Sequence, residues 1–153
     1  MTQYLSLFPF IVLVFAAAST GMQFMPGEWY AALNKPAWTP PNWAFPVAWT
    51  ILYLMIAIAG WLAWRAGGAG TAIVIWAIGL TLNALWSYLM FGRHDITLAL
   101  IDIAALWVAT AAFICAAWNL DRNAAYLFVP YLAWISFAAA LNFEVWRLNP
   151  AGG

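Results

Sequence analysis

The side chains able to do acid–base or metal chemistry are few in this sequence of 153 residues. It holds five Asp and Glu, five Lys and Arg, and one His. His94 stands beside Arg93 and Asp95 in a turn, so no second imidazole is available to hold haem and no Ser-His-Asp triad can be argued. No phosphate-binding loop, dinucleotide fingerprint or metal-ligand spacing occurs. These residues predict no metal site and offer little to an enzyme.

Three polar side chains interrupt otherwise apolar segments at similar depths. Asn83, Asp102 and Asn142 lie at similar depths below the same end of the predicted bundle. Their distance from the nearest charged residue or turn is roughly 7–12 Å by helical rise. In a membrane, polar groups at that depth face the bundle interior or a wet cavity, and Trp49 occupies the same layer. We therefore expect a mostly apolar pocket with a few fixed polar groups. The alternatives are that the asparagines link helices by hydrogen bonds and that Asp102 pairs with Arg93 or reaches the interface.

The elements that must position these groups are membrane spans. The chain is 67% hydrophobic and 7% charged, which leaves too few solvating groups to cover a water-soluble globule. Charged residues divide it into apolar stretches, each long enough for the roughly 20 residues that a spanning helix needs. The sequence predicts an all-α integral membrane protein, a single transmembrane domain over residues 1–153. Its five helices are expected at 4–24, 43–64, 71–91, 96–119 and 123–147.

The first connection, residues 25–42, is longer than the others and differs from them in composition. It carries prolines and aromatic rings, namely Pro26, Pro36, Pro40, Pro41, Trp29, Tyr30 and Trp38. Prolines fix φ and exclude regular helix, so the segment should be ordered and semi-rigid. We expect it to act as a lid on the bundle, or alternatively as an interfacial loop anchored by its Trp rings.

The charges at the two ends of the bundle do not orient the chain. One end carries Arg65 and Arg122, whereas the other carries Lys35, Arg93 and Arg147. A difference of one residue is too small for the positive-inside rule. The formal net charge is zero and no basic tract occurs, so nucleic acid is not an expected partner. The partner predicted for the surface of the helices is membrane lipid.

The twelve tryptophans separate by their depth in the predicted spans. Rings near span ends normally anchor at the headgroups, and this group consists of Trp43, Trp61, Trp64, Trp118 and Trp146. Trp76 and Trp86 are intermediate. Three others lie too deep for that role and are expected to pack between helices or to line a cavity: Trp49, Trp107 and Trp134.

Small residues at regular spacing predict contact between two copies of the chain. Ala72 and Gly79 share one face of the third segment, and Ala17 and Gly21 have small-xxx-small spacing on the first. Such residues let helices approach closely in lipid, where hydrophobic drive between helices is absent. We therefore expect a homodimer packed through these faces.

The tryptophan and proline motifs resemble one known family, the translocator proteins, whose bacterial members are called tryptophan-rich sensory proteins. One run in this chain resembles the first loop and second helix of the family: Trp29-Tyr30, Leu33, Lys35-Pro36, Trp38, Pro40-Pro41, Trp43, Trp49 and Leu52-Tyr53. The end of its third helix resembles Asn83, Trp86 and Phe91-Gly92-Arg93. Its fifth helix resembles Pro130-Tyr131, Trp134, Leu141-Asn142 and Trp146-Arg147. A bacterial-type member is therefore expected.

This resemblance implies a five-helix bundle, often dimeric, with a ligand pocket beneath the first loop. Members of the family bind porphyrins, and the animal members bind cholesterol and benzodiazepine-type drugs. The residues that would line the pocket here are Trp38, Trp49, Asn83, Trp86, Trp134, Ala138 and Leu141. Phe143 stands where the animal sterol motif requires a tyrosine, which argues against sterol as a ligand.

The function implied by the resemblance is tetrapyrrole binding in a membrane, which would allow regulation of tetrapyrrole metabolism. Protoporphyrin- or haem-type rings would stack on Trp faces, and no cofactor is obligatory. Some members promote light-dependent porphyrin breakdown, and Trp49 and Trp134 would then donate electrons to the excited ring. The alternatives are transport of a tetrapyrrole or another small lipophile, and ligand-responsive sensing or assembly without chemistry. A bacterial inner membrane is the expected location.

Overall fold

The computed structural model describes residues 2–150, and most of them are helical. In chain order the elements are η1 (Thr2–Leu7), α1 (Phe8–Gln23), α2 (Glu28–Ala32), α3 (Ala44–Gly67), α4 (Thr71–Ser87), η2 (Tyr88–Gly92), α5 (Ile96–Trp118) and α6 (Arg122–Leu148). A 3₁₀ turn, η1, leads into α1, and a π-helical turn, η2, extends α4. Within this range, five helices are long and apolar enough to cross a membrane. The predicted spans are confirmed, with ends that differ from expectation by at most three residues.

Residues at the turns explain where the spans begin and end. The Asp95 side chain accepts the N–H of Leu98 at 2.8 Å, and Asp121 caps the first turn of α6 in the same way. An acidic N-cap satisfies donors that the helix start leaves free, and it complements the positive end of the helix dipole. After α3, Gly68 adopts a φ of 60°, a left-handed conformation that favours glycine, and its N–H closes onto the carbonyl of Trp64.

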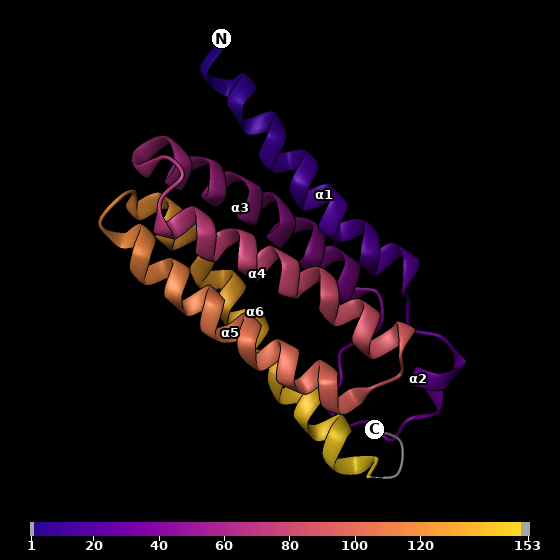
Figure 1. The fold of residues 1–153 in the computed structure, drawn as a ribbon. Helices are drawn as coiled ribbons and strands as arrows, with labels where there is room; N and C mark the ends of the chain where they lie inside the picture. The colour runs from indigo at the N-terminus through magenta and orange to yellow at the C-terminus, as the bar shows by residue number, and fades with distance from the viewer. Residues whose placement is uncertain (1, 151–153) are drawn as a thin grey trace.

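The spanning helices form one bundle with α2 beyond one of its ends (Figure 1). Helix α6 packs against α3 and α5, α4 packs against α5 and α1, and α1 also packs against α3. The C-terminal end of α6 lies at the same end of the bundle as α2. The first loop and the end of α6 are therefore neighbours in space.

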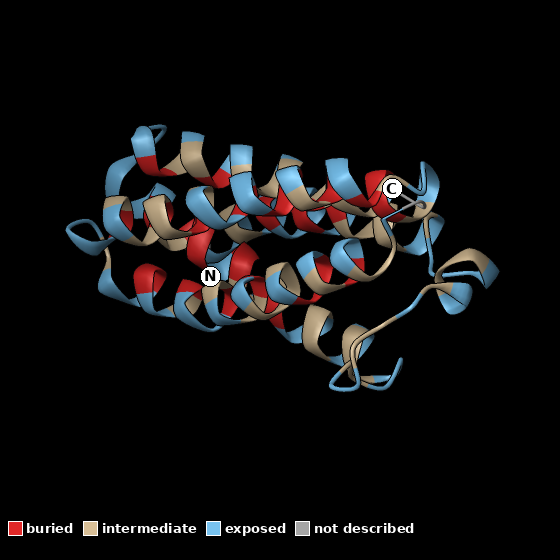
Figure 2. Ribbon diagram, turned by 90° about the horizontal axis from the view of Figure 1, so that it is seen from below, coloured by how far each residue is buried: buried red, intermediate tan, exposed pale blue. Residues whose placement is uncertain are grey.

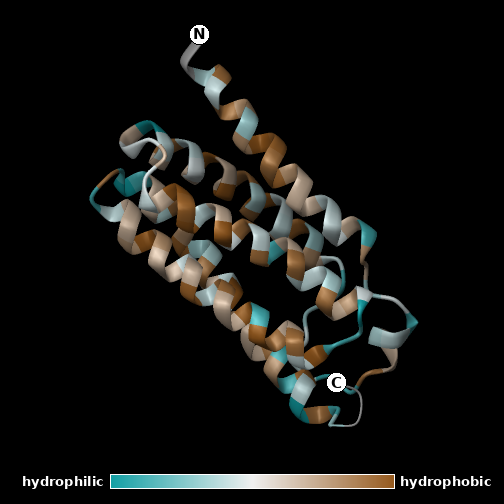
Figure 3. Ribbon diagram, viewed as in Figure 1, coloured by the Kyte–Doolittle hydropathy of each residue, from teal (hydrophilic) through white to brown (hydrophobic). Residues whose placement is uncertain are grey.

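The outer surface of the bundle is apolar. Figure 2 shows the buried residues on the inward faces of the helices, and Figure 3 shows hydrophobic residues spread along their length. Several large apolar side chains are more than half exposed, among them Leu5, Phe8, Phe15, Ile101 and Val108. A surface of this kind is stable in lipid and would be a liability in water.

The interior contains two hydrophobic cores. The larger runs along the bundle and includes Trp76, Phe113 and Phe128. The smaller lies at the α2 end and includes Leu89, Met90, Ile96, Leu141 and Val145, with Trp29, Tyr30 and Leu33 of the first loop packed against it. The first loop therefore rests on an apolar surface of its own.

Two of the depth-based expectations for tryptophans are wrong. Trp61 was expected at the headgroups, yet it is only 6% exposed, and its Nε1 donates to Ser6 Oγ at 2.9 Å. The reason is η1, which extends the first span across this end of α3. Trp107 was expected inside the bundle, but it is 41% exposed and donates to Ser136 Oγ at 2.8 Å on the outer face of α5 and α6. Depth along a helix does not determine the direction in which a side chain points.

The small residues expected at a dimer interface serve packing inside the chain. Ala72 and Ala17 are buried. A Cβ on Gly79 would lie 3.8 Å from Ala109, so this face of α4 packs against α5. A Cβ on Gly21 would lie 3.7 Å from Ser87 Oγ, where α1 meets α4. Homodimerisation stays a prediction, but these faces are already used within the chain.

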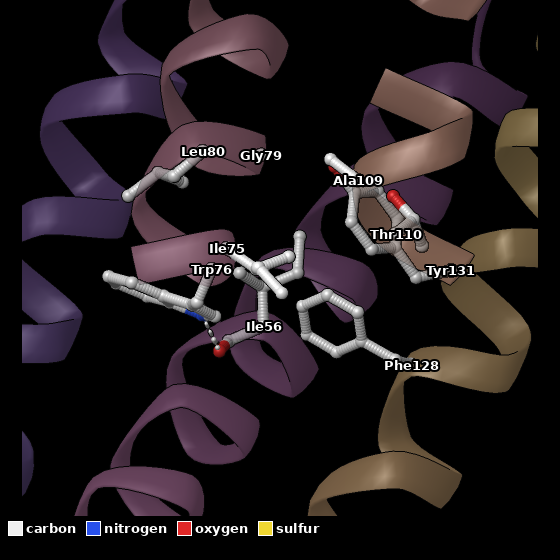
Figure 4. Close-up of a pocket in the computed structure, with 9 residues that line it drawn as sticks. All are labelled: Ile56, Ile75, Trp76, Gly79, Leu80, Ala109, Thr110, Phe128 and Tyr131. Atoms are coloured by element: carbon white, nitrogen blue, oxygen red, sulfur yellow. Dashed lines mark hydrogen bonds between the residues drawn. The ribbon is translucent and has the colours of Figure 1, made fainter. Parts of the chain in front are cut away.

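Gly60 is the glycine at which close helix approach is essential. A Cβ there would lie 2.5 Å from Trp76 Cε2 and 2.6 Å from Trp76 Nε1, and that indole donates to the Ile56 carbonyl at 2.9 Å (Figure 4). Because Trp76 is buried, the ring has no room to move aside. Gly60→Ala is expected to lower the free energy of unfolding by about 1–3 kcal/mol through overpacking. Thermal unfolding in detergent, followed by circular dichroism, measures this loss.

Gly79→Ala is the matched control, since it adds the same methyl group to a spanning helix at an ordinary van der Waals distance. Its thermal stability should stay at or above that of the wild type, because Ala is the better helix former. Equal losses for the two variants would contradict the packing role assigned to Gly60.

Candidate functional site

Asn83 on α4 joins three helices through its side-chain amide. The Tyr53 hydroxyl on α3 donates to Asn83 Oδ1 at 3.0 Å, and Asn83 Nδ2 donates to the Tyr131 hydroxyl on α6 at 2.9 Å. Both Asn83 and Tyr131 are buried. A buried polar group costs free energy unless it is paired, so this network holds α3, α4 and α6 at a defined spacing.

Asn142 makes a second link between helices. Trp86 Nε1 donates to Asn142 Oδ1 at 3.0 Å, and Asn142 Nδ2 donates to the Ile96 carbonyl at 3.3 Å. Asn83 and Asn142 therefore both link helices by hydrogen bonds, which is one of the alternatives that the sequence left open. Asp102 is also buried, and the alternative that it pairs with Arg93 is wrong, because neither carboxylate oxygen has a hydrogen-bond partner.

Trp49 and Trp134, the two expected electron donors, meet across α3 and α6. Their ring centroids lie 6.3 Å apart with an interplanar angle of 86°. Trp49 also stacks on Tyr53 at 5.3 Å and meets the edge of Tyr131 at 6.3 Å. Phe45 meets Trp134 at 5.9 Å. These five rings form what we call the aromatic cluster, and its edge-to-face contacts are favourable.

The other expected site residues lie around this cluster. Trp38, in the first loop, is 47% exposed and packs edge to face on Phe137 at 5.6 Å. Ala138 packs against the larger core. Leu141 belongs to the smaller core, against which Trp86 also packs. The site therefore spans the boundary between the two cores, beneath the first loop.

The first loop lies against the bundle as expected for a lid. Trp29 stacks on His94 with centroids 4.3 Å apart and an interplanar angle of 11°. The backbone N–H of Asn34 donates to Asn149 Oδ1 at 3.0 Å, and Asn149 Nδ2 donates back to the Asn34 carbonyl at 2.8 Å. The Lys35 ammonium donates to three carbonyls of the loop itself at 2.7–3.2 Å. The loop is thus tied to the α4–α5 turn and to the end of α6.

Tyr30 shows how the loop is held to the smaller core. Its ring lies under the Lys35 ammonium at 4.8 Å and meets Phe91 edge-on at 5.5 Å. Burial raises the pKa of the Tyr30 phenol, so the side chain is neutral at ordinary pH. Tyr30 belongs to α2, a short helix between Pro26 and Pro36 that the proline pattern did not predict.

A buried cavity of about 10 Å³ lies between α3, α4, α5 and α6 (Figure 4). It is lined by Ile56, Ile75, Trp76, Gly79, Leu80, Ala109, Thr110, Phe128 and Tyr131. Tyr131 is the residue that it shares with the aromatic cluster. The cavity has room for about one water, whereas small-molecule sites occupy roughly 300–1,000 Å³. This cavity by itself is therefore too small for a large ligand.

Two buried polar side chains at this site have no hydrogen-bond partner among the described residues. One is the donor Trp134 Nε1, and the other is the Asp102 carboxylate, an acceptor when ionised. Buried groups of this kind are rare in folded proteins and ask for an explanation. Across residues 2–150, no three His, Cys, Asp or Glu side chains gather as metal ligands.

Tyr53 and Tyr131 are site residues that the sequence reasoning missed. Tyr53 follows Trp49 by four residues and Tyr131 precedes Trp134 by three. Residues at these spacings share one face of a helix, so the period of the helix could have revealed them. In the sequence, both tyrosines stand out only as members of the family motifs Leu52-Tyr53 and Pro130-Tyr131.

A bundle of five spans with an apolar exterior and an aromatic interior defines a multi-pass integral membrane protein. Residues 6–147 match the model of the TspO/MBR family. The chain belongs to this family, and the resemblance expected from its tryptophan and proline motifs is confirmed.

Its relatives come from bacteria, an archaeon and animals. Protein CrtK of Rhodobacter capsulatus is 41% identical over 138 residues, which cover 88% of this chain and 86% of the relative. The tryptophan-rich sensory protein of Cereibacter sphaeroides is 43% identical over 134 residues, 88% of this chain and 85% of its own length. The human translocator protein is 36% identical over 137 residues, 84% of this chain and 81% of its own length.

Proposed function

We propose that the aromatic cluster binds a tetrapyrrole, a porphyrin of the protoporphyrin or haem type, within the membrane. The observation that carries this proposal is the pair Trp49 and Trp134, which bring two indole rings together from α3 and α6 beneath the first loop. Large flat apolar rings stack on such faces. The unpartnered N–H of Trp134 is available to an acceptor on the ligand.

The charges at the lid end suit the carboxylates of a porphyrin. Lys35 lies in the lid and Arg93 in the α4–α5 turn beside His94, on which the lid residue Trp29 stacks. Arg147 lies near the end of α6, close to Asn149, which binds the lid. Cationic side chains pair readily with carboxylates. Bound tetrapyrrole would thus have its apolar ring in the cluster and its acids at the polar end.

The proposal includes a bacterial inner membrane as the location, and it is supported by relatives from two bacteria that are 41% and 43% identical to the chain. It includes drug-like lipophiles as further ligands of the same site and a homodimer as the assembled form. The chemistry that we assign to the site is light-driven loss of bound porphyrin: an electron passes from Trp49 or Trp134 to the photoexcited ring, and the reduced ring then reacts with dissolved dioxygen. The protein would regulate tetrapyrrole metabolism by holding or removing this ligand.

A second candidate function is sensing, which the attachment of the lid favours. Entry of a large ligand beneath the lid would displace a loop that is bound to the α4–α5 turn through Trp29 and to the end of α6 through Asn34. Occupancy of the site would then change the surface at one end of the bundle. Such a change is what a partner protein could read without any chemistry in the site.

Ala138 offers a direct test of tetrapyrrole binding. Ala138→Phe adds a bulky ring to a half-buried position of α6 beside the aromatic cluster. The matched control is Ala140→Phe, because Ala140 is exposed on the outer face of the same helix. Protoporphyrin is titrated into each protein in lipid nanodiscs, with absorbance and Trp quenching as readouts and empty nanodiscs as the blank.

Ala138→Phe should weaken protoporphyrin binding by about tenfold or more, whereas Ala140→Phe should bind within about twofold of the wild type. Circular dichroism must show the same helix content in all three proteins. Equal affinities in the two folded variants, or no saturable binding to the wild type, would reject the proposed function.

A further inference from the structure

Asp102 is a buried carboxylate in the half of the bundle nearer the first loop. It lies on α5, six residues after Ile96, which is about 9 Å along the helix. Its side chain is 5% exposed, and neither oxygen has a hydrogen-bond partner. A carboxylate without a partner in the hydrocarbon region costs several kcal/mol, and ionisable residues found there commonly belong to functional sites.

Residues 2–150 supply no hydrogen-bond or ion-pair partner for this group. The Lys35 ammonium donates to carbonyls of the lid. Arg65 lies over the ring of Trp61, and Arg122 lies over the ring of Trp118. Arg147 forms an ion pair with Glu144, the one ion pair found within the described range. Arg93, the remaining cation, makes no hydrogen bond or ion pair with Asp102 either, so no described residue supplies a cationic partner for this carboxylate.

The facing polar side chains are already paired with one another. Both ends of the Asn83 amide are bonded to tyrosine hydroxyls, and both ends of the Asn142 amide are bonded as well. Thr110, two turns along α5 from Asp102, donates to the carbonyl of Leu106. Asp102 is thus left out of a network that satisfies its neighbours.

Helix register places Asp102 at the depth of the aromatic site. The hydrogen bond from Asn142 to the Ile96 carbonyl sets the register of α6 against α5. The close approach of Gly79 to Ala109 sets the register of α4 against α5. Continuing these antiparallel registers brings Asp102 level with Ser136 on α6, two residues from both Trp134 and Ala138, and with Trp86 on α4. Because Asp102 is buried and α5 packs against α4 and α6, its side chain lies on the face of α5 that meets these two helices.

A buried carboxylate at the depth of several electron-rich rings is a combination that recognises organic cations. Rings of Trp and Tyr attract a cation through their faces, and a desolvated carboxylate supplies the opposite charge. Trp49, Tyr53, Tyr131 and Trp134 provide the rings, with neighbouring centroids 5.3–6.3 Å apart. We propose that Asp102 is the counter-ion for a protonated amine on a lipophilic aromatic ligand. This inference rests on the proposed function in that it uses the same site.

Two probes of equal shape isolate the charge. The first is N,N-dimethyl-2-(1-naphthyl)ethylamine, which is protonated at pH 7, and the second is 1-(3-methylbutyl)naphthalene, its neutral carbon isostere. Each is equilibrated with protein in nanodiscs of zwitterionic lipid, and binding to empty nanodiscs is subtracted. Wild type should bind the amine at least about tenfold more tightly than the isostere. Equal affinity of the wild type for the two probes would overturn the proposal without any variant.

Asp102→Asn keeps the shape of the side chain and removes its charge, so the preference for the amine should fall to about twofold or less. Asp102→Ser serves the same purpose if the first variant does not fold. Glu28→Gln is the matched control, because Glu28 is an exposed carboxylate at the start of α2, and it should keep the full preference. A preference that survives in folded Asp102→Asn, or that is lost in Glu28→Gln, would assign the effect to general charge and reject the site.

Protoporphyrin binding to the same proteins separates this inference from the proposed function. Protoporphyrin carries acids and no amine, so Asp102→Asn should leave its affinity unchanged or raise it. Loss of amine preference with intact protoporphyrin binding supports both ideas. Amine preference in a wild type that binds no protoporphyrin would reject the proposed function and keep the role of Asp102.

Discussion

Trp134→Phe is expected to weaken protoporphyrin binding by no more than about tenfold, the loss of one hydrogen bond to the ligand, and to lower the rate of light-driven loss of bound porphyrin by at least about tenfold. Phe keeps an aromatic face and most of the volume, but it removes the more easily oxidised indole and its N–H. The Trp134 N–H is buried without a partner, so its removal breaks no hydrogen bond inside the chain. Illumination of bound protoporphyrin in nanodiscs, followed by its absorbance, measures the decay rate.

Trp107→Phe is the matched control for this experiment. Trp107 lies at a similar depth, but it is 41% exposed and bonded to Ser136 on the outer face. Its replacement should leave both affinity and decay rate unchanged. If Trp134→Phe and Trp107→Phe decay at the wild-type rate while binding normally, Trp134 packs in the cluster and has no photochemical role. Trp49→Phe then tests the other indole of the pair.

Asn83→Leu is expected to cause the largest loss of stability among single changes at the site. The substitution leaves the buried Tyr131 hydroxyl without its donor and the Tyr53 hydroxyl without its acceptor. We expect the free energy of unfolding to fall by about 1–3 kcal/mol in total, since hydrogen bonds within membranes average less than buried ones in water-soluble proteins. The midpoint of thermal unfolding in detergent should fall accordingly, and protoporphyrin affinity should fall with it because the tyrosines support Trp49.

A second substitution tests whether the unpaired hydroxyls cause this loss. Tyr53→Phe added to Asn83→Leu removes one of them, so the double variant should be more stable than Asn83→Leu alone. Thr81→Val is the control on the same helix, because the Thr81 hydroxyl is exposed and bonds only the Ala77 carbonyl. A double variant less stable than Asn83→Leu would show that the loss comes from packing volume.

The membrane spans, their ends and the family could be read from the sequence. Charges such as Arg65, Asp95 and Asp121 stand at the turns because an ionised group is costly at the bilayer centre, so the charge pattern marks the boundaries directly. Length then limits each apolar stretch to one helix. The family followed from Trp and Pro spacing in the first loop, which the lid geometry now explains: Trp29 stacks on His94, and Trp38 packs on Phe137.

The directions of side chains could not be read in the same way. Trp61 and Trp107 were placed by depth, and both were placed wrongly, because depth along a helix says nothing about which face meets a neighbour. In a membrane the usual amphipathic signal is weak, since the face toward lipid and the face toward the bundle are both apolar. For the same reason Ala72 and Gly79 were read as a dimer face, although they pack within the chain.

The sequence by itself determined the class of protein, the number of spans and the set of aromatic and polar residues available to a site. Charged residues are costly in the bilayer core, so their positions along the chain mark where each span begins and ends. Only the tertiary structure decided which of these residues meet. It paired Asn83 with Tyr53 and Tyr131, tied Asn34 to Asn149, and left Asp102 and the Trp134 N–H without partners. Pairing depends on helix rotation and register, and these are set by close packing such as that of Gly60 on Trp76.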